Sequence, residues 1–204
     1  MIRKIFILLA IIFSAAYTCS AQGRYKININ ASNTKATINS VDIVVNNTNI
    51  CVSMRGKIIV DPNNNANRQG DIAITYYDQF DGPDNKGKLK SIGDIAFTYY
   101  DRYDGFDNIG KLKSIGKLIF TYYDRFDGTD NTGKLKSIGK TNITYYDKYD
   151  GFDNIGKLKA VGNITVTYYD RFDTSEAMGT IKQISGNSPN VNIRRLQEFN
   201  ADND

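Results

Sequence analysis

Histidine and tryptophan are absent from this chain of 204 residues, and cysteine occurs only twice. Without histidine there is no Ser-His-Asp triad, no Cys-His dyad and no histidine-ligated zinc. The sequence also has no Gly-rich phosphate loop with the usual spacing before Lys-Ser or Lys-Thr. These absences exclude the commonest hydrolase, metalloenzyme and nucleotide-binding sites, and we expect a protein that is not an enzyme.

The two cysteines do not predict a disulfide. Cys19 lies in an N-terminal segment that we expect to be removed, which leaves Cys51 as a single thiol. A single thiol has no internal partner. Because Cys51 stands in the apolar run Ile50-Cys51-Val52, we expect it to be a small buried hydrophobe rather than a reactive group.

The N-terminus has the pattern of a secretory signal. The basic pair Arg3-Lys4 precedes an apolar run from Ile5 to Ala16, which is shorter than the ~20 residues of a membrane-spanning helix. Cleavage after Ala21 removes residues 1–21 as a signal peptide; the alternative is lipidation of Cys19. The chain is therefore predicted to be exported to the periplasm, the cell surface or the medium, with no transmembrane segment in its mature form.

The charge balance is nearly even. Of 26 basic residues, Arg3 and Lys4 fall in the expected signal peptide, which leaves 24 against 22 acidic residues. A net charge of this size does not predict a nucleic-acid partner or an anionic membrane surface.

A tandem repeat makes up the body of the chain. Each unit has 23 residues and contains a Tyr-Tyr-Asp triplet followed by a recurring Gly and Lys; the units begin at Gly70, Gly93, Gly116, Gly139 and Gly162. The fifth unit departs most, because residues 174–178 replace the Gly-x-Asp-Asn loop. An atypical last unit is expected where a repeat meets solvent instead of a neighbour.

Each unit is predicted to form two strands. In the second unit Ile95, Phe97, Tyr99 and Tyr103 form an apolar face with period two, and a shorter strand follows at 111–115. We predict an all-β fold, an elongated coiled array of tandem β-hairpin repeats in an antiparallel meander. The alternative is a β-solenoid with one unit per coil. Stacking like-charged Asp residues one strand apart, ~4.8 Å, makes the solenoid less favourable.

The same alternation recurs in the third unit, where Leu118, Phe120, Tyr122 and Phe126 form the apolar face. Such a face must be covered, either by coiling of the array or by another part of the chain.

The regions outside the repeats also carry strand patterns. Tyr25–Ile29, Ala36–Val45 and Ile50–Val60 are strand-like, and Val191–Leu196 is predicted to be a closing strand. The predicted organisation is a signal peptide at 1–21, a β-rich cap region at 22–69, the repeats at 70–184, and a closing strand with a disordered tail at 185–204. The tail itself is predicted over residues 200–204. The cap region is expected either to cap the array or to cover its apolar face.

The string Thr98-Tyr99-Tyr100-Asp101, followed by Gly110-Lys111-Leu112, resembles the YD repeat of Rhs-type secreted proteins. That family alternates a Tyr-Asp strand with a Gly-Arg-Leu turn, so the resemblance implies coiled β-hairpin sheets over residues 70–184 and a shell-like role. This chain departs from the family in having eight residues, 102–109, between its Asp and Gly. It is also similar in period to MORN hairpin repeats, whose Trp it lacks, and to uncharacterised secreted repeat proteins of outer-membrane bacteria.

The loop of each unit gathers oxygen ligands. In the second unit these are Asp101, Asp104, Asp107 and Asn108. Oxygen ligands at close spacing suit Ca²⁺. The spacing is not that of an EF-hand, and Asx-turns explain the same residues. We favour the turns and expect no cofactor, with Ca²⁺ as the alternative.

A second candidate site is a row of tyrosines on the polar face, beside Arg102 and Arg125. The row consists of Tyr77, Tyr100, Tyr123, Tyr146 and Tyr169. Rows of Tyr next to basic groups stack on sugar rings or hold anionic glycans. The competing explanation is cross-strand packing that stiffens the sheet.

These patterns favour an exported, non-enzymatic β-repeat scaffold of the cell envelope or exterior, working through shape and assembly. The alternative is a module that binds a glycan or envelope polymer along the tyrosine row. Expected partners are protein or polysaccharide at the cell surface, or further copies of the chain.

Overall fold

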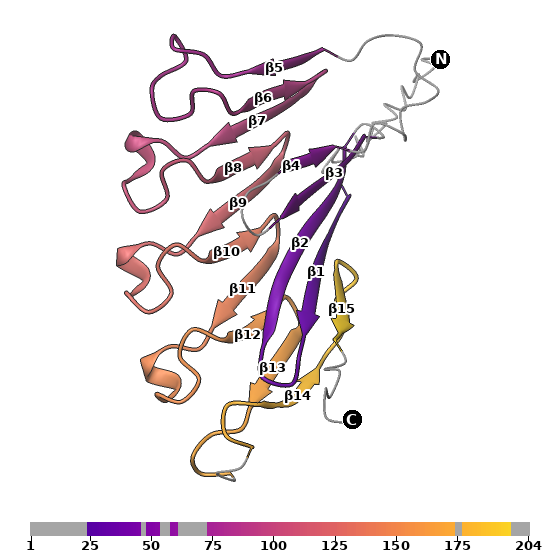
Figure 1. Ribbon diagram of the computed structural model, residues 1–204, viewed down its shortest axis with the longest axis vertical. Helices are drawn as coiled ribbons and strands as arrows, with labels where there is room; N and C mark the ends of the chain where they lie inside the picture. The colour runs from indigo at the N-terminus through magenta and orange to yellow at the C-terminus, as the bar shows by residue number, and fades with distance from the viewer. Residues whose placement is uncertain (1–23, 46–47, 54–57, 61–72, 174–176, 197–204) are drawn as a thin grey trace, which may run out of the picture.

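A computed structural model describes residues 24–45, 48–53, 58–60, 73–173 and 177–196. The predicted signal peptide, Cys19 and the predicted tail at 200–204 lie outside these ranges. In the described ranges the β-strands form two sheets, and short 3-10 turns lie in the loops of one of them (Figure 1). No helix in the described ranges is both long and apolar enough to cross a bilayer.

The repeats form one ten-stranded sheet in which spatial order follows chain order. Every neighbouring pair is antiparallel. The strands are β5 (Ile74–Tyr76), β6 (Leu89–Ile92), β7 (Ile95–Tyr99), β8 (Leu112–Ile115), β9 (Leu118–Tyr122), β10 (Leu135–Ile138), β11 (Thr141–Tyr145), β12 (Leu158–Val161), β13 (Ile164–Tyr168) and β14 (Ile181–Ser185). The prediction of antiparallel hairpins is confirmed, and the solenoid alternative is wrong.

Two kinds of turn join the strands. A short turn, Gly93-Asp94, links β6 to β7, and Gly93 has a φ of 54°, a region that glycine enters without a Cβ clash. The long loops contain 3-10 turns: η2 (Arg102–Asp104), η3 (Arg125–Asp127) and η4 (Lys148–Asp150). Each begins with a capping box formed by two aspartates three residues apart. The side chain of each aspartate accepts a hydrogen bond from the backbone amide of the other. These aspartates therefore shape the turn.

A second, five-stranded sheet has the order β15-β1-β2-β3-β4. Its strands are β1 (Arg24–Ala31), β2 (Ala36–Val45), β3 (Thr48–Ser53), β4 (Ile58–Val60) and β15 (Val191–Arg195). β15, in the region of the predicted closing strand, joins the edge of β1 in parallel and so belongs to this sheet and not to the repeat array. The strand pattern predicted over Ile50–Val60 belongs to two strands, β3 and β4, which pair with each other.

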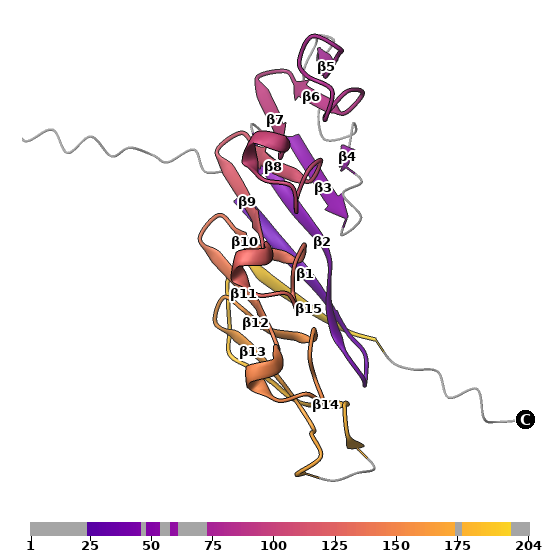
Figure 2. The same ribbon diagram turned by 90° about the vertical axis from the view of Figure 1, so that its left-hand side faces the viewer.

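This cover sheet lies against the apolar face of the repeats (Figures 1 and 2). Ile27, Ile43 and Ile50 of the cover sheet belong to the same buried cluster as Phe97 and Phe120 of the array. Of the two roles considered for the N-terminal region, the structure shows the second: it covers the apolar face.

Two sequence-based assignments of burial are wrong. Tyr103 and Phe126, placed on the apolar face by their spacing, are among the most exposed side chains of the protein. The strand ends at Tyr99 in the second unit, and the capped 3-10 turn then carries the chain out of the sheet. The alternation of period two does not continue through such a turn.

Cys51 is half-buried rather than fully buried, and it stands opposite Asp42 across the β2–β3 pair. Partial burial, together with the neighbouring Asp42 carboxylate, raises the pKa of its thiol. A raised pKa favours the neutral thiol, so an unreactive group is the expected behaviour.

Candidate functional site

The predicted tyrosine row lies between units. The Tyr100 hydroxyl donates to the backbone carbonyl of Phe120 in the next unit at 3.0 Å. Tyr77, Tyr123 and Tyr146 make the equivalent bond at 2.8–3.1 Å. Each ring also meets the first tyrosine of the next unit edge-on, with centroids 5.7–6.0 Å apart. These half-buried side chains join neighbouring units, as the cross-strand packing explanation supposed. Tyr169, in the last unit, is also half-buried and has Lys182 over its ring at 5.5 Å.

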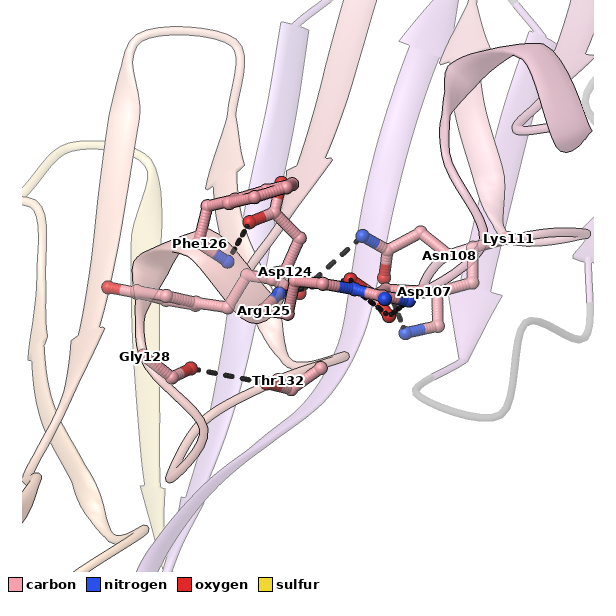
Figure 3. A network of polar contacts seen from close by, with 9 residues as sticks. Asp107, Asn108, Lys111, Asp124, Arg125, Phe126, Gly128 and Thr132 are labelled. Carbon is pink, nitrogen blue, oxygen red and sulfur yellow. Dashed lines mark hydrogen bonds and ion pairs between the residues drawn. The ribbon is translucent and has the colours of Figure 1, made fainter.

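The predicted basic partners of that row form ion pairs with the preceding unit. Arg102 donates to both carboxylate oxygens of Asp84, at 2.8 and 3.0 Å. Arg125 binds Asp107 in the same two-pronged manner (Figure 3). The guanidinium lowers the pKa of each of these carboxyls to about 2. The arginine charges are thus balanced locally.

The four oxygen-bearing residues considered for Ca²⁺ all contact protein donors. Asp101 accepts a hydrogen bond from the backbone amide of Tyr103 at 2.8 Å, and Asp104 forms an ion pair with Lys113. Asp107 pairs with Arg125, and the buried Asn108 side chain accepts a hydrogen bond from Lys111 at 2.8 Å (Figure 3). Within the described ranges, no three acidic or cysteine side chains are grouped in a way that would hold a metal ion.

The structure reveals a different repeated feature, which we call the aromatic row. It takes one ring from each unit, at the same position of the loop, and each ring is between 87% and 92% exposed. Its members are Phe80, Tyr103, Phe126, Tyr149 and Phe172. Scattered exposed apolar side chains are ordinary on protein surfaces, but one that recurs at the same loop position of every unit makes the row a candidate interaction surface.

The backbone beneath every ring of the aromatic row is held in the same way. The amide of each aromatic residue donates to the aspartate two residues before it, at 2.8 Å in all five units. A Gly follows the turn in four units, for example Gly105 at a φ of 107°. The rings are therefore presented from similar, internally bonded turns.

Additional exposed rings stand beside the row in alternate units. Phe106 and Phe152 are exposed in the second and fourth units, where the first and third units have Pro83 and Thr129. Sequence reasoning missed this surface because it continued the strand pattern into the loop. The available signal was the Asp-x-aromatic-Asp string, in which the two aspartates cap a turn and leave the ring between them outside the sheet.

No protein-family model matches the chain, and neither the curated proteins nor the solved structures contain a match.

Proposed function

We propose that the protein is an exported, non-enzymatic β-repeat scaffold that binds an extended neutral glycan along the aromatic row. The observation that carries this proposal is the recurrence of one almost fully exposed ring in each of the five units. The mature chain would act in the periplasm, at the cell surface or in the medium. The coiling expected of the array is part of the same proposal.

Ring spacing favours a linear ligand. Equivalent positions of neighbouring hairpins lie two strands apart, about 9.5 Å in an undistorted sheet. A polymer made of sugar rings offers apolar C–H faces at regular intervals, and aromatic side chains combine large contact area with few rotatable bonds. Five weak stacking contacts on one rigid support add up through effective concentration.

Local charge favours a neutral polymer over a polyanion. Three basic side chains at the turns that carry the row, Arg102, Arg125 and Arg171, are each engaged by an aspartate of the preceding unit. At the same position of the fourth unit, the Lys148 ammonium lies 5.2 Å from the centre of the Tyr149 ring and forms no ion pair with the described residues. The Lys113 ammonium is similarly paired with Asp104. An anionic polymer would therefore have to compete with carboxylates that are already in place at each of these groups except Lys148.

The original tyrosine row is a poor alternative site for the same ligand. Its hydroxyls bond backbone carbonyls of the next unit and its rings are packed edge-on. Binding a sugar there would require these contacts to be broken.

Sedimentation assays with insoluble cellulose, chitin, mannan and peptidoglycan would test the proposal, followed by affinity electrophoresis in soluble fragments of any polymer that binds. We expect the triple variant Tyr103→Ser/Phe126→Ser/Tyr149→Ser to weaken binding at least tenfold, because each stacked ring contributes ~0.5–1.5 kcal/mol. Ile119→Ser is the matched control, since Ile119 is exposed on the sheet and outside the row. Failure of every polymer to bind, or equal loss in the control, would contradict the proposal.

Export is tested separately by expressing the full chain in a bacterium with an outer membrane. The expected result is a mature protein starting at Gln22 outside the cytoplasm. Retention of the uncleaved chain in the cytoplasm would contradict the proposed location.

A further inference from the structure

A groove separates the two sheets on the side of the long loops. The cover sheet closes over the fifth unit, where the backbone amide of Ala36 donates to the Tyr168 hydroxyl at 3.3 Å and Tyr168 is 5% exposed. At the equivalent position of the first unit, Tyr76 is 60% exposed. The space left between the layers has a volume of about 1160 Å³ and reaches from the first unit to the fourth.

Aliphatic side chains and one tyrosine per unit, Tyr76, Tyr99, Tyr122 and Tyr145, make up most of the lining of the groove. One leucine per unit comes from the array: Leu89, Leu112, Leu135 and Leu158. The cover sheet contributes Ile38, Val41, Val52 and Ile58. Small-molecule sites typically have volumes of ~300–1,000 Å³. A larger groove that extends along four units suits a long apolar ligand better than a compact one.

A row of lysines, one per unit, runs along the array side of this space. These groove lysines are Lys88, Lys111, Lys134 and Lys157. The Lys111 ammonium donates to Asn108 Oδ1 at 2.8 Å and to the carbonyl of Gly133 in the next unit at 2.6 Å. It also lies 5.0 Å from the centre of the Tyr122 ring. An ammonium has three donors, so these contacts leave one for a ligand.

The groove lysines differ from a second row two residues later. Lys113, like its equivalents, forms an ion pair with an aspartate of its own unit. No such carboxylate pairs with any groove lysine in the described part of the chain. Partial burial lowers the pKa of all four groove lysines. Asp84, Asp107 and Asp130 act on three of these lysines through space and partly offset that effect, but they do not contact them. Half-buried cations without a contacting carboxylate are stabilised by an incoming anion.

We propose that this groove binds an anionic lipid, with its acyl chains on the leucine floor and its head group on the groove lysines. The combination of an aliphatic floor with a line of ammonium groups that form no ion pair within the described ranges favours this class of ligand. A polysaccharide would leave its hydroxyls unpaired against leucine side chains, at a cost in free energy. The lipid site is distinct from the aromatic row and does not depend on glycan binding.

The test measures uptake of a dansyl-labelled fatty acid by the mature protein and its displacement by unlabelled probes. Palmitate should displace it at least tenfold more strongly than hexadecanol, which has the same tail without the charge. Butyrate and inorganic phosphate, which have the charge without the tail, should not displace it. Absence of uptake by folded protein, or equal displacement by palmitate and hexadecanol, would overturn the proposal.

The variant Lys111→Met/Lys134→Met keeps the apolar stems and removes two charges. We expect it to reduce the preference for palmitate over hexadecanol while it still takes up the labelled fatty acid. Lys113→Met/Lys136→Met, in the ion-paired row, is the matched control and should keep the preference. Circular dichroism establishes that each variant is folded, and Lys88→Met in the first unit replaces the double variant if that one unfolds.

Mass spectrometry of ligands that co-purify with the protein should show a lipid; a bound peptide would refute the proposal.

Discussion

The central units of the array differ from its two end units at the positions that contact a neighbour. Arg102, Arg125 and Arg171 reach back to the preceding unit, while the first unit, which has none before it, carries Gln79 at that position. Asn154 and Lys157 reach forward to the fifth unit. The fifth unit has Ala177 and Thr180 in their places.

This difference separates two functions of the repeated residues. The Tyr-Tyr-Asp triplet is present in all five units, and its aspartate serves the turn within each unit. The Asn and Lys positions are kept in all four units that have a following unit. The Arg position is kept in three of the four units that have a preceding unit, and the fourth unit has Lys148 there. Drift at the last unit therefore identifies the Asn and Lys residues as contacts between units, which a repeat array needs for its cooperativity. The second tyrosine of the triplet is kept there as Tyr169, although its equivalents also contact the next unit.

The largest expected contrast concerns one core position. Phe120 is buried in the third unit, whereas Ile74 at the same position of the first unit is 52% exposed. We expect Phe120→Ala to lower the free energy of unfolding by ~3–5 kcal/mol, because it removes a large ring from a packed interior. Ile74→Ala should cost much less. Urea denaturation followed by circular dichroism gives both values; similar losses would mean that the first unit is covered as fully as the third.

An intermediate effect is expected for the buried asparagine. Asn131 accepts a hydrogen bond from Lys134 at 2.8 Å and donates to the carbonyl of Tyr146 in the next unit at 3.3 Å. Asn131→Ala removes both bonds from a buried site and should cost ~1–3 kcal/mol in urea denaturation, although the Tyr146 carbonyl and the Lys134 ammonium each keep a bond to Gly156. The reverse change in the last unit, Ala177→Asn, has no following unit to bond and should leave stability unchanged. A stabilising Ala177→Asn would contradict this assignment.

A smaller effect, dependent on pH, is expected for the exposed ion pair of Arg125 with Asp107. Arg125 lowers the pKa of Asp107 to about 2 in the folded protein, below the unfolded value of ~3.9. The pair therefore stabilises the fold above about pH 4, and this contribution is lost as the pH falls toward 2. The difference in urea midpoint between wild type and Arg125→Gln should be constant from pH 7 to 5, narrow below about pH 4 and close only below about pH 2, where Asp107 is protonated in the folded protein. High salt should narrow it at neutral pH.

The matched change at the first unit is Gln79→Arg. Because no preceding unit supplies an aspartate, we expect its urea midpoint to equal that of wild type at every pH. A gap of the Arg125→Gln size, with the opposite sign, would show that position 79 has an acidic partner after all.

The smallest effect is expected for Ca²⁺. Asp104 and Asp107 in a central loop are engaged by Lys113 and Arg125, so binding an ion there would require two ion pairs to be broken. Millimolar Ca²⁺ should therefore leave the melting temperature unchanged. A clear rise that disappears in Asp104→Ala/Asp127→Ala would show that the loops bind the ion.

The sequence by itself determined the repeat, the strands and the hairpin connection. Period-two alternation around Phe97 and Phe120, and Gly at the short turns, are local properties that act within a few residues of each other. The repulsion expected between Asp101 and its equivalents, if they were stacked one strand apart, correctly disfavoured a solenoid with one unit per coil. Of the strands outside the repeats, Ala36–Val45 was placed with the bounds that the structure shows.

Only the tertiary structure decided what covers the array, which rings reach solvent and where a groove remains. The cover sheet meets the repeats through contacts between residues far apart in the chain, such as Tyr25 with Thr141 at 2.7 Å. No local pattern encodes such a contact. Phe120 and Phe126 have the same chemistry and differ only in whether the chain at that point is still in the sheet. The capped turn takes Phe126 out of the sheet, so its ring stays in water. Phe120 remains in the sheet, and packing of the second sheet buries its ring.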